Sequence, residues 1–315
     1  MATTHPVRFG IQTGQQLIEW PTLLDVWQKA DAWGYDSLWN FDHFYPIFVD
    51  PDGPCLEGWT TLAALAQATR RARIGTLVNG NTYRHPCVTA KMAATLDHVS
   101  GGRLNLGIGA GWFELEHRAF GIDFKTVPQR LAALDEALQI IRGMLTQERT
   151  TVHGRHYRVT DAIGLPKPAQ QPHPPIMIGG TGQRVLLRIV AQYADMWNAS
   201  ASAERMQELI GVIARHGERV DRDPARIEKT VLIPFCYRAA PEREQFLLNI
   251  VANMRQTTPE AARRQAIVGG KDECLDTIGR YVAAGVTHFI FMLIMPQLDE
   301  VQAFAEEVAP AARAG

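Results

Sequence analysis

Two segments, "RLNLGIGAGW" at residues 103–112 and "PQRLAALDEALQIIRGML" at residues 128–145, decide the fold. The first is a short β-rich run that ends in glycines. In the second, apolar residues recur at steps of three and four, and charged residues take the other face: Leu131, Leu134, Leu138, Ile141 and Leu145. Pro128 stands where the first turn of a helix tolerates proline. The two segments therefore predict one strand followed by one amphipathic helix.

The same alternation runs along the whole chain. Eight β-rich runs are separated by longer helical patterns, and they lie at residues 7–12, 36–41, 73–78, 103–108, 175–179, 194–198, 229–235 and 287–293. Another helical stripe is formed by Val88, Met92, Leu96 and Val99, and a helix through Tyr281 is predicted to end at Gly285. Parallel strands need crossover helices, and eight such units close a barrel. The sequence therefore predicts an α/β fold, a single (β/α)8 TIM barrel domain over residues 1–315.

Two segments are longer than a barrel connection requires. Residues 146–174 are rich in Thr, His and Pro without a helical period, and residues 236–270 hold more helix than one crossover needs. We interpret both as insertions. Long excursions from the mouth of a barrel commonly serve as lids, so both are candidate lids.

Composition excludes several classes of protein. Hydrophobic residues make up 46% and charged residues 21% of the 315 residues, and the net charge is −1, which fits a globular protein and disfavours nucleic acid or an anionic membrane as a partner. The four cysteines lie far apart without a C-x-x-C pair, which indicates a reduced, cytoplasmic setting. No apolar run is long enough to span a membrane.

The chemistry of such a barrel lies where strands end, and "NFDHFYP" at residues 40–46 ends the second predicted strand. His43 has an imidazole that exchanges protons near neutral pH, and the adjacent Asp42 can hold its tautomer. The alternative is that Asp42 caps the loop and His43 fills space among aromatic rings. A metal site is disfavoured because the first strand continues as QTGQQ without a histidine.

Glycine-rich turns follow two other predicted strands. Gly107, Gly109 and Gly111 end the run at 103–108 and imply close approach of a ligand or of packed neighbours, but Trp112 breaks the dinucleotide fingerprint. Gly179, Gly180, Thr181 and Gly182 end the run at 175–179 and are predicted to open a helix with Arg184 in its first turn. Such a turn is either an anion site or a tight turn capped by Thr181.

The run at 73–78 leads into "NGNTYRHP", residues 79–86. The amides of Asn79 and Asn81 can bind the carbonyls and nitrogens of a heteroaromatic ring. Arg84 either contributes to such a site or pairs with a neighbouring acid.

Together these loops resemble the bacterial luciferase-like flavin monooxygenase superfamily, and in particular its branch that uses the deazaflavin coenzyme F420. The resemblance covers residues 9 to about 286 and rests on WNFDHF, TYRHP, RLNLGIGAGWFELEHRAFGIDF, PIMIGGTGQR and ADMWN. It implies that Asp42 and His43 face C5 of the coenzyme, with His43 in proton transfer. It also implies a non-prolyl cis peptide at or near Leu77 and Val78 behind the ring, and a phosphate held by Gly179, Gly180 and Gly182.

One position departs from the sugar-phosphate dehydrogenases of this branch. These carry a glutamate directly after the strand-end glycines, where this chain has Trp112, with Glu114 and Glu116 following. A tryptophan there favours a flat, apolar substrate pocket. We predict an F420-dependent oxidoreductase acting on a small organic substrate, and a homodimer. The alternatives are a two-component monooxygenase that uses reduced FMN, and a flavin- or deazaflavin-binding protein without catalysis.

Overall fold

The computed structural model describes residues 5–294 and 296–314. Its main sheet is parallel and closed, because β3 pairs with both β2 and β5. The barrel strands are β1 (Arg8–Thr13), β2 (Ser37–Asn40), β3 (Arg73–Thr76), β5 (Leu104–Gly109), β8 (Ile176–Gly179), β9 (Met196–Ala199), β10 (Glu228–Pro234) and β11 (His288–Leu293). Each lies within or beside one of the eight predicted runs, so the prediction of a (β/α)8 barrel is confirmed.

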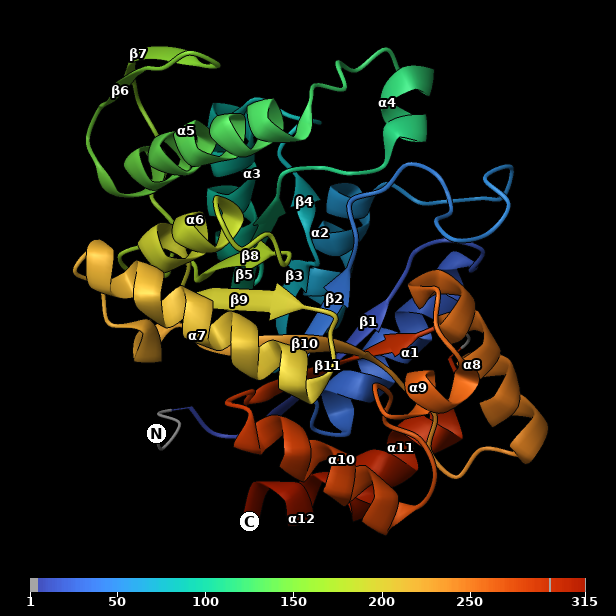
Figure 1. Ribbon diagram of the computed structural model, residues 1–315. Helices are drawn as coiled ribbons and strands as arrows, with labels where there is room; N and C mark the ends of the chain where they lie inside the picture. The colour runs from blue at the N-terminus through green and yellow to red at the C-terminus, as the bar shows by residue number, and fades with distance from the viewer. Residues whose placement is uncertain (1–4, 295, 315) are drawn as a thin grey trace.

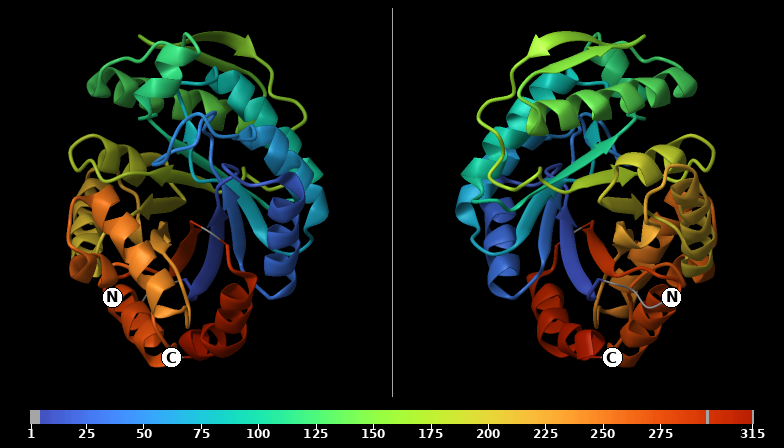
Figure 2. Two further views of the ribbon diagram at one scale, coloured as in Figure 1. Left: turned by 90° about the vertical axis from the view of Figure 1, so that its right-hand side faces the viewer. Right: turned by 90° about the vertical axis from the view of Figure 1, so that its left-hand side faces the viewer.

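Helices surround the strands (Figure 1; Figure 2). They are α1 (Trp20–Ala32), α2 (Gly58–Ala68), α3 (Pro86–Val99), α4 (Glu114–Ala119), α5 (Val127–Thr146), α6 (Leu186–Tyr193), α7 (Ala203–Arg219), the 3-10 helix η1 (Pro224–Arg226), α8 (Pro241–Arg255), α9 (Pro259–Arg263), α10 (Lys271–Ala283), α11 (Leu298–Glu307) and α12 (Ala309–Ala314). Within the described residues, no helix is both long and apolar enough to cross a membrane.

Local sequence signals explain two of these helices. The predicted helix at 128–145 is confirmed as α5, where the side chain of Gln129 accepts a hydrogen bond from the amide of Thr126 (3.1 Å) and so caps the first turn. The predicted end of α10 is confirmed as well. Gly285 adopts a φ of +97°, and the amide of Val286 reaches back to the carbonyl of Tyr281 (3.0 Å), as in a Schellman motif.

The apolar stripe predicted for α3 is not its buried face. Val88 and Val99 are exposed, and the buried side of the helix carries Ala90, Ala93 and Ala94 with Leu96. Alanine allows close approach of a neighbouring helix, and α3 packs against α5. Periodicity alone therefore identified the helix but not its packed side.

The two insertions begin at opposite faces of the barrel. Residues 146–174 contain the antiparallel hairpin of β6 (Thr150–His153) and β7 (Arg158–Ala162), which lies beside α5 (Figure 1). This segment connects helix α5 to strand β8, so it begins at the face of the barrel opposite to the carboxyl ends of the strands. Residues 236–270 follow β10 directly and contain α8 and α9. Only the second insertion starts from the mouth of the barrel.

Large side chains fill the barrel interior. Trp39, Leu77, Met177, Met196 and Ile290 form a buried cluster. They point inward from the strands and close the space beneath the carboxyl ends. A ligand can therefore reach the barrel only at the mouth.

Candidate functional site

A cavity of about 950 Å³ lies at the carboxyl ends of the strands. All eight barrel strands, or the residues that follow them directly, contribute to its wall: Thr13, Asp42, Leu77, Gly109, Gly179, Asn198, Leu232 and Met292. The cavity is at the upper end of the range of roughly 300–1,000 Å³ that small-molecule sites occupy. Its position is the one predicted from the end of each strand.

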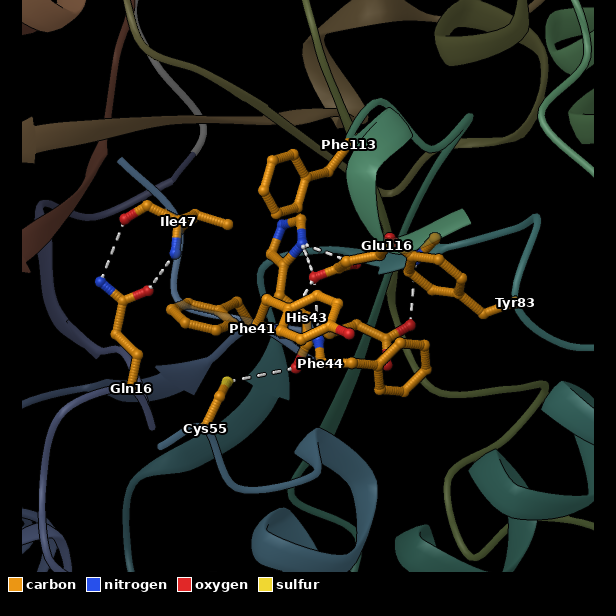
Figure 3. A network of polar contacts seen from close by, with 12 residues as sticks. Gln16, Phe41, His43, Phe44, Ile47, Cys55, Tyr83, Phe113 and Glu116 are labelled. Atoms are coloured by element: carbon orange, nitrogen blue, oxygen red, sulfur yellow. Dashed lines mark hydrogen bonds and ion pairs between the residues drawn. The ribbon is translucent and has the colours of Figure 1, made fainter. Parts of the chain in front are cut away.

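His43 lies at this cavity, packed between aromatic rings. Its imidazole meets the rings of Phe41, Trp112 and Phe113 edge-on, with centroid distances of 5.3, 5.4 and 5.7 Å. Figure 3 shows two of these rings, those of Phe41 and Phe113. Such edge contacts fix the plane of the ring without consuming its nitrogen atoms. The two interpretations of His43 made from the sequence therefore combine, because the residue is packed among aromatics and also faces the cavity.

The acid that contacts His43 is Glu116, not the adjacent Asp42. The Nδ1 atom of His43 lies 3.1 and 3.2 Å from the two carboxylate oxygens of Glu116, which stands in the short helix α4 (Figure 3). A carboxylate only accepts hydrogen bonds, so Nδ1 carries a proton. Within the described residues, Nε2 of His43 has no hydrogen-bond partner. Glu116 thus fixes the tautomer and leaves the second nitrogen available.

Glu116 is fully buried and heavily hydrogen-bonded. The amides of Phe44 (2.9 Å) and Tyr45 (3.2 Å) and the hydroxyl of Tyr83 donate to its carboxylate. Burial alone raises the pKa of Glu116, but the hydrogen bonds and charge of His43 and the bonds from Tyr83 and Tyr45 outweigh it, so this pKa lies below the usual value. Glu116 is therefore a carboxylate at neutral pH and can stabilise a protonated His43.

Asp42 has a different set of partners. Its carboxylate accepts hydrogen bonds from Nη1 of Arg84 (2.7 and 2.8 Å) and from the amide of Gly80 (3.1 Å), and Arg84 also donates to Glu57 (2.8 Å). Burial raises the pKa of Asp42 to about 6, although Arg84 opposes the shift. The expectation that Asp42 orients His43 is wrong, because neighbouring residues in an extended chain point in opposite directions. Of the two interpretations of Arg84, pairing with an acid is the one observed.

The predicted cis peptide is present between Leu77 and Val78, and both residues line the cavity. Gly107 and Gly109 make room for this segment. A Cβ atom on Gly107 would lie 2.0 Å from the carbonyl oxygen of Thr76, and one on Gly109 would lie 2.9 Å from the side chain of Val78. Packed neighbours, rather than a ligand, therefore account for Gly107, whereas Gly109 also borders the cavity.

Asn79 and Asn81 separate in space. Asn79 lines the cavity, and its amide nitrogen donates to the carbonyl of Gly107 (2.5 Å). Its Oδ1 atom is buried and has no partner within residues 5–294 and 296–314. Asn81 instead bonds through its amide to the hydroxyl of Tyr157 (3.1 Å) in the first insertion and does not line the cavity. Asn79 is thus the better placed of the two to meet a ligand.

Gly111 and Trp112 follow β5 at the rim. Gly111 has a φ of +78°, and a Cβ atom there would lie 2.5 Å from the hydroxyl of Thr82. Trp112 is 51% exposed and stacks on Phe48, with ring centroids 5.6 Å apart and planes at 17°. Both residues line the cavity, where the indole of Trp112 contributes a flat apolar surface. That this surface binds a substrate stays a prediction.

The turn after β8 is only partly as predicted. Gly179 and Gly180 line the cavity, whereas Thr181, Gly182 and Arg184 are exposed beyond its wall. Helix α6 begins at Leu186, later than expected, because residues 183–185 form a turn. The amide of Leu187 bonds to the carbonyl of Gly182 (3.0 Å), one residue further back than in an α-helix.

Gly180 is required by the fold itself. Its φ is +126°, and a Cβ atom would lie 2.5 Å from the side chain of Leu186. The tight-turn interpretation therefore explains Gly180, and the anion interpretation depends on the exposed Thr181, Gly182 and Arg184.

Sequence reasoning did not select Glu116 as a site residue, and it named Asn79 only together with Asn81. Glu116 was recognised only as a glutamate displaced from an expected position, and its signal was its place four residues after Trp112 in "WFELEH". Its contact with His43 spans 73 residues, which no local pattern predicts. Asn79 was one of two equivalent asparagines at a strand exit.

Comparisons with known proteins give one consistent result. The sequence model of the family described as luciferase-like monooxygenase matches residues 1–248. The chain is 28% identical to the F420-dependent glucose-6-phosphate dehydrogenase of Microbacterium testaceum (strain StLB037), with 98% of each chain covered. It is 28% identical to the 4-hydroxyprotoasukamycin monooxygenase of Streptomyces nodosus subsp. asukaensis, over 81% of this chain and 75% of that protein.

A solved structure of an F420-dependent secondary alcohol dehydrogenase in complex with an F420-acetone adduct superposes with a TM-score of 0.86. The two sequences are 20% identical, and 98% of this chain and 99% of the other are covered. This similarity is one of fold.

Proposed function

The chain belongs to the luciferase-like monooxygenase family, and we propose that it is a coenzyme F420-dependent oxidoreductase that transfers hydride between C5 of the coenzyme and a small organic substrate. The observation that carries this proposal is the His43–Glu116 pair at the cavity, whose wall also includes Leu77 and Val78. The 28% identity to an F420-dependent dehydrogenase over nearly the whole length supports the choice of coenzyme.

The residues at the cavity fit a deazaflavin ring. Leu77 and Val78 present an apolar surface at the end of β3, and the buried Oδ1 of Asn79 offers an unused acceptor to a ring N–H group. Gly109 and Gly179 have no side chains, so the space beside Val78 stays open to a ligand. We assign these five residues to ring binding.

The coenzyme phosphate is proposed to lie at the exposed turn after β8. There the backbone of Thr181 and Gly182 and the guanidinium of Arg184 are accessible beside the cavity edge at Gly180. Backbone amides and a cation are the usual partners of phosphate.

When bound, the coenzyme supplies a carbon that gives or takes hydride. The protein supplies proton chemistry. Glu116 holds the proton on Nδ1 of His43, so Nε2 is the atom that exchanges a proton at the cavity. Asp42, paired with Arg84 and bound by the amide of Gly80, ties the loop after β2 to the end of β3 and so positions His43.

A titration of the purified apoprotein with coenzyme F420 and with FMN tests the proposal. We expect saturable binding of F420 at micromolar or lower concentration and weaker binding of FMN. Binding of FMN alone, with oxygen consumption after its reduction, would favour the alternative of a two-component monooxygenase. The similarity to a monooxygenase over 81% of this chain is the observation that keeps this second candidate in view.

Binding of F420 without turnover of any substrate would instead favour the alternative of a non-catalytic deazaflavin- or flavin-binding protein. The buried and fully partnered Glu116 beside His43 argues against that alternative, because an unused site has no need for a buried charge.

The assembly and location are also proposals. We propose a cytoplasmic homodimer whose partner is a small-molecule substrate rather than nucleic acid or a membrane, as the charge balance, the dispersed cysteines and the resemblance indicate. Sedimentation velocity of the purified protein at several concentrations checks the dimer.

A further inference from the structure

We infer that the substrate is an uncharged and largely apolar molecule, held by an apolar wall made of Leu17, Phe48, Trp112, Phe246, Ile250 and Met254. The inference rests on the proposed function, because it takes the part of the cavity beyond the coenzyme contacts as the substrate site.

The apolar wall comes from four separate parts of the barrel mouth. Leu17 follows β1, Phe48 follows β2, Trp112 follows β5, and the other three residues lie on α8 in the second insertion. Three of its aromatic side chains are half exposed: Phe48 at 60%, Trp112 at 51% and Phe246 at 49%. Large apolar side chains gathered around a cavity and open to water mark a ligand surface. The second insertion therefore acts as one side of the substrate site, as expected for a lid.

The charges at the cavity exclude an anionic substrate. No lysine or arginine is among the described residues that line it, and its ionisable groups are Asp42, His43 and Tyr83. The guanidinium of Arg84, which contacts the cavity residue Asp42, is committed to Asp42 and Glu57. A phosphorylated sugar would place a dianion in this cavity without a cationic partner, which is unfavourable. The proposed site for the coenzyme phosphate, around Arg184, lies outside this lining.

The size of the cavity leaves room for a substrate beside the coenzyme ring. At about 950 Å³ it can hold a coenzyme ring together with a second molecule of similar bulk. None of the residues of the apolar wall is among the five assigned to ring binding. Leu17, Phe48 and the residues of α8 are therefore available to contact a substrate.

The test measures binding rather than turnover. Calorimetric titration of the apoprotein and of the F420-loaded protein with straight-chain 2-ketones, from 2-hexanone to 2-decanone, should show affinity rising about fourfold per methylene group. Carboxylates of matched length should bind at least tenfold more weakly, and glucose 6-phosphate should give no saturable heat.

Substitutions on α8 locate the binding. Phe246→Ala should weaken 2-octanone binding about fivefold, because the ligand would no longer bury the exposed half of the Phe246 side chain. Phe246→Arg should weaken 2-octanone binding further and strengthen octanoate binding. Ile163→Ala is the matched control, because Ile163 is also half exposed but lies in the first insertion away from the cavity. It should leave both affinities unchanged.

Affinity that does not depend on ketone length, or tight binding of glucose 6-phosphate, would overturn the inference. So would equal effects of Phe246→Ala and Ile163→Ala. If F420 binds and the ketone series fails, the inference alone is wrong. If the ketone series behaves as expected and F420 does not bind, the proposed function is wrong. The apolar wall is then the substrate site of an enzyme that uses another cofactor.

Discussion

Replacing Glu116 by glutamine tests the central contact of the site. The side chain keeps its size, so it can still accept from the amides of Phe44 and Tyr45 and contact Tyr83. What it loses is the negative charge at 3.1–3.2 Å from Nδ1 of His43.

The expected magnitude follows from this geometry. A hydrogen bond to a charged group contributes about 1.5–3 kcal/mol and a neutral one about 0.5–1.5 kcal/mol, so the variant loses about 1–2 kcal/mol of preference for a proton on Nδ1. This corresponds to a change of roughly 5- to 30-fold in the ratio of the two neutral tautomers of His43. Turnover of any substrate that needs Nε2 should fall by a similar factor, while the dissociation constant of F420 stays within about twofold.

The assay is nitrogen-15 NMR of the imidazole ring at a pH where His43 is neutral, which requires neither coenzyme nor substrate. The wild-type protein should show His43 protonated on Nδ1, and Glu116→Gln should show a mixture. Glu114→Gln is the matched control, because Glu114 lies on the same helix, is exposed and pairs only with Arg118 among the contacts observed. An unchanged tautomer in a folded Glu116→Gln protein would refute the assigned role of Glu116.

Three further predictions concern neighbouring parts of the site. His43→Ala should lower turnover on the order of 100-fold or more with F420 affinity and melting temperature nearly unchanged, and undiminished turnover would contradict proton transfer by His43. Gly182→Asp should weaken F420 binding about 10- to 100-fold, whereas Gly182→Ala should weaken it much less, because a Cβ atom there lies at an ordinary contact distance of 3.5 Å from Leu186. Coenzyme fragments that hold the ring but lack the phosphate should bind both variants alike. If these fragments lose as much affinity as the whole coenzyme, the phosphate does not bind at this turn. Since the pKa of Asp42 is raised from 3.8 to about 6, the folded protein holds this proton more tightly than the unfolded chain, so its contribution to stability is present below pH 4 and lost as the pH rises to 6. Denaturant unfolding should therefore show the free energy of unfolding of the wild type falling by about 2 kcal/mol relative to that of Asp42→Asn between pH 4 and pH 6, and parallel pH profiles would be evidence against a raised pKa.

The positions of the strands and of the loop after the second strand were predictable from the sequence. Eight β-rich runs with helices between them predict a closed (β/α)8 barrel. In such a barrel the residues that follow each strand all lie at the same mouth. Asp42, His43, Leu77, Val78, Gly109, Trp112, Gly179 and Gly180 all line the cavity that results. The physical reason is that strand and helix periodicity are local properties, and the direction of a parallel strand fixes which of its ends faces the mouth.

Partnerships across the mouth were decided only by the tertiary structure. Glu116 reaches His43 across 73 residues and Arg84 reaches Asp42 across 42, and in both cases the sequence offered other candidates. The partner of His43 was expected next to it in the chain, and the start of α6 was expected at the glycines rather than at Leu186.

These differences share one cause. Loops have no repeating pattern, so the direction in which each loop side chain points depends on how the closed barrel brings separate strand ends together. The sequence by itself determined the barrel, the mouth and the residues that stand there. The closure of the barrel decided which acid holds the imidazole and which asparagine has a buried side-chain oxygen without a partner among the described residues. It also decided that α8 borders the cavity, because α8, unlike the hairpin of β6 and β7, follows the carboxyl end of a strand.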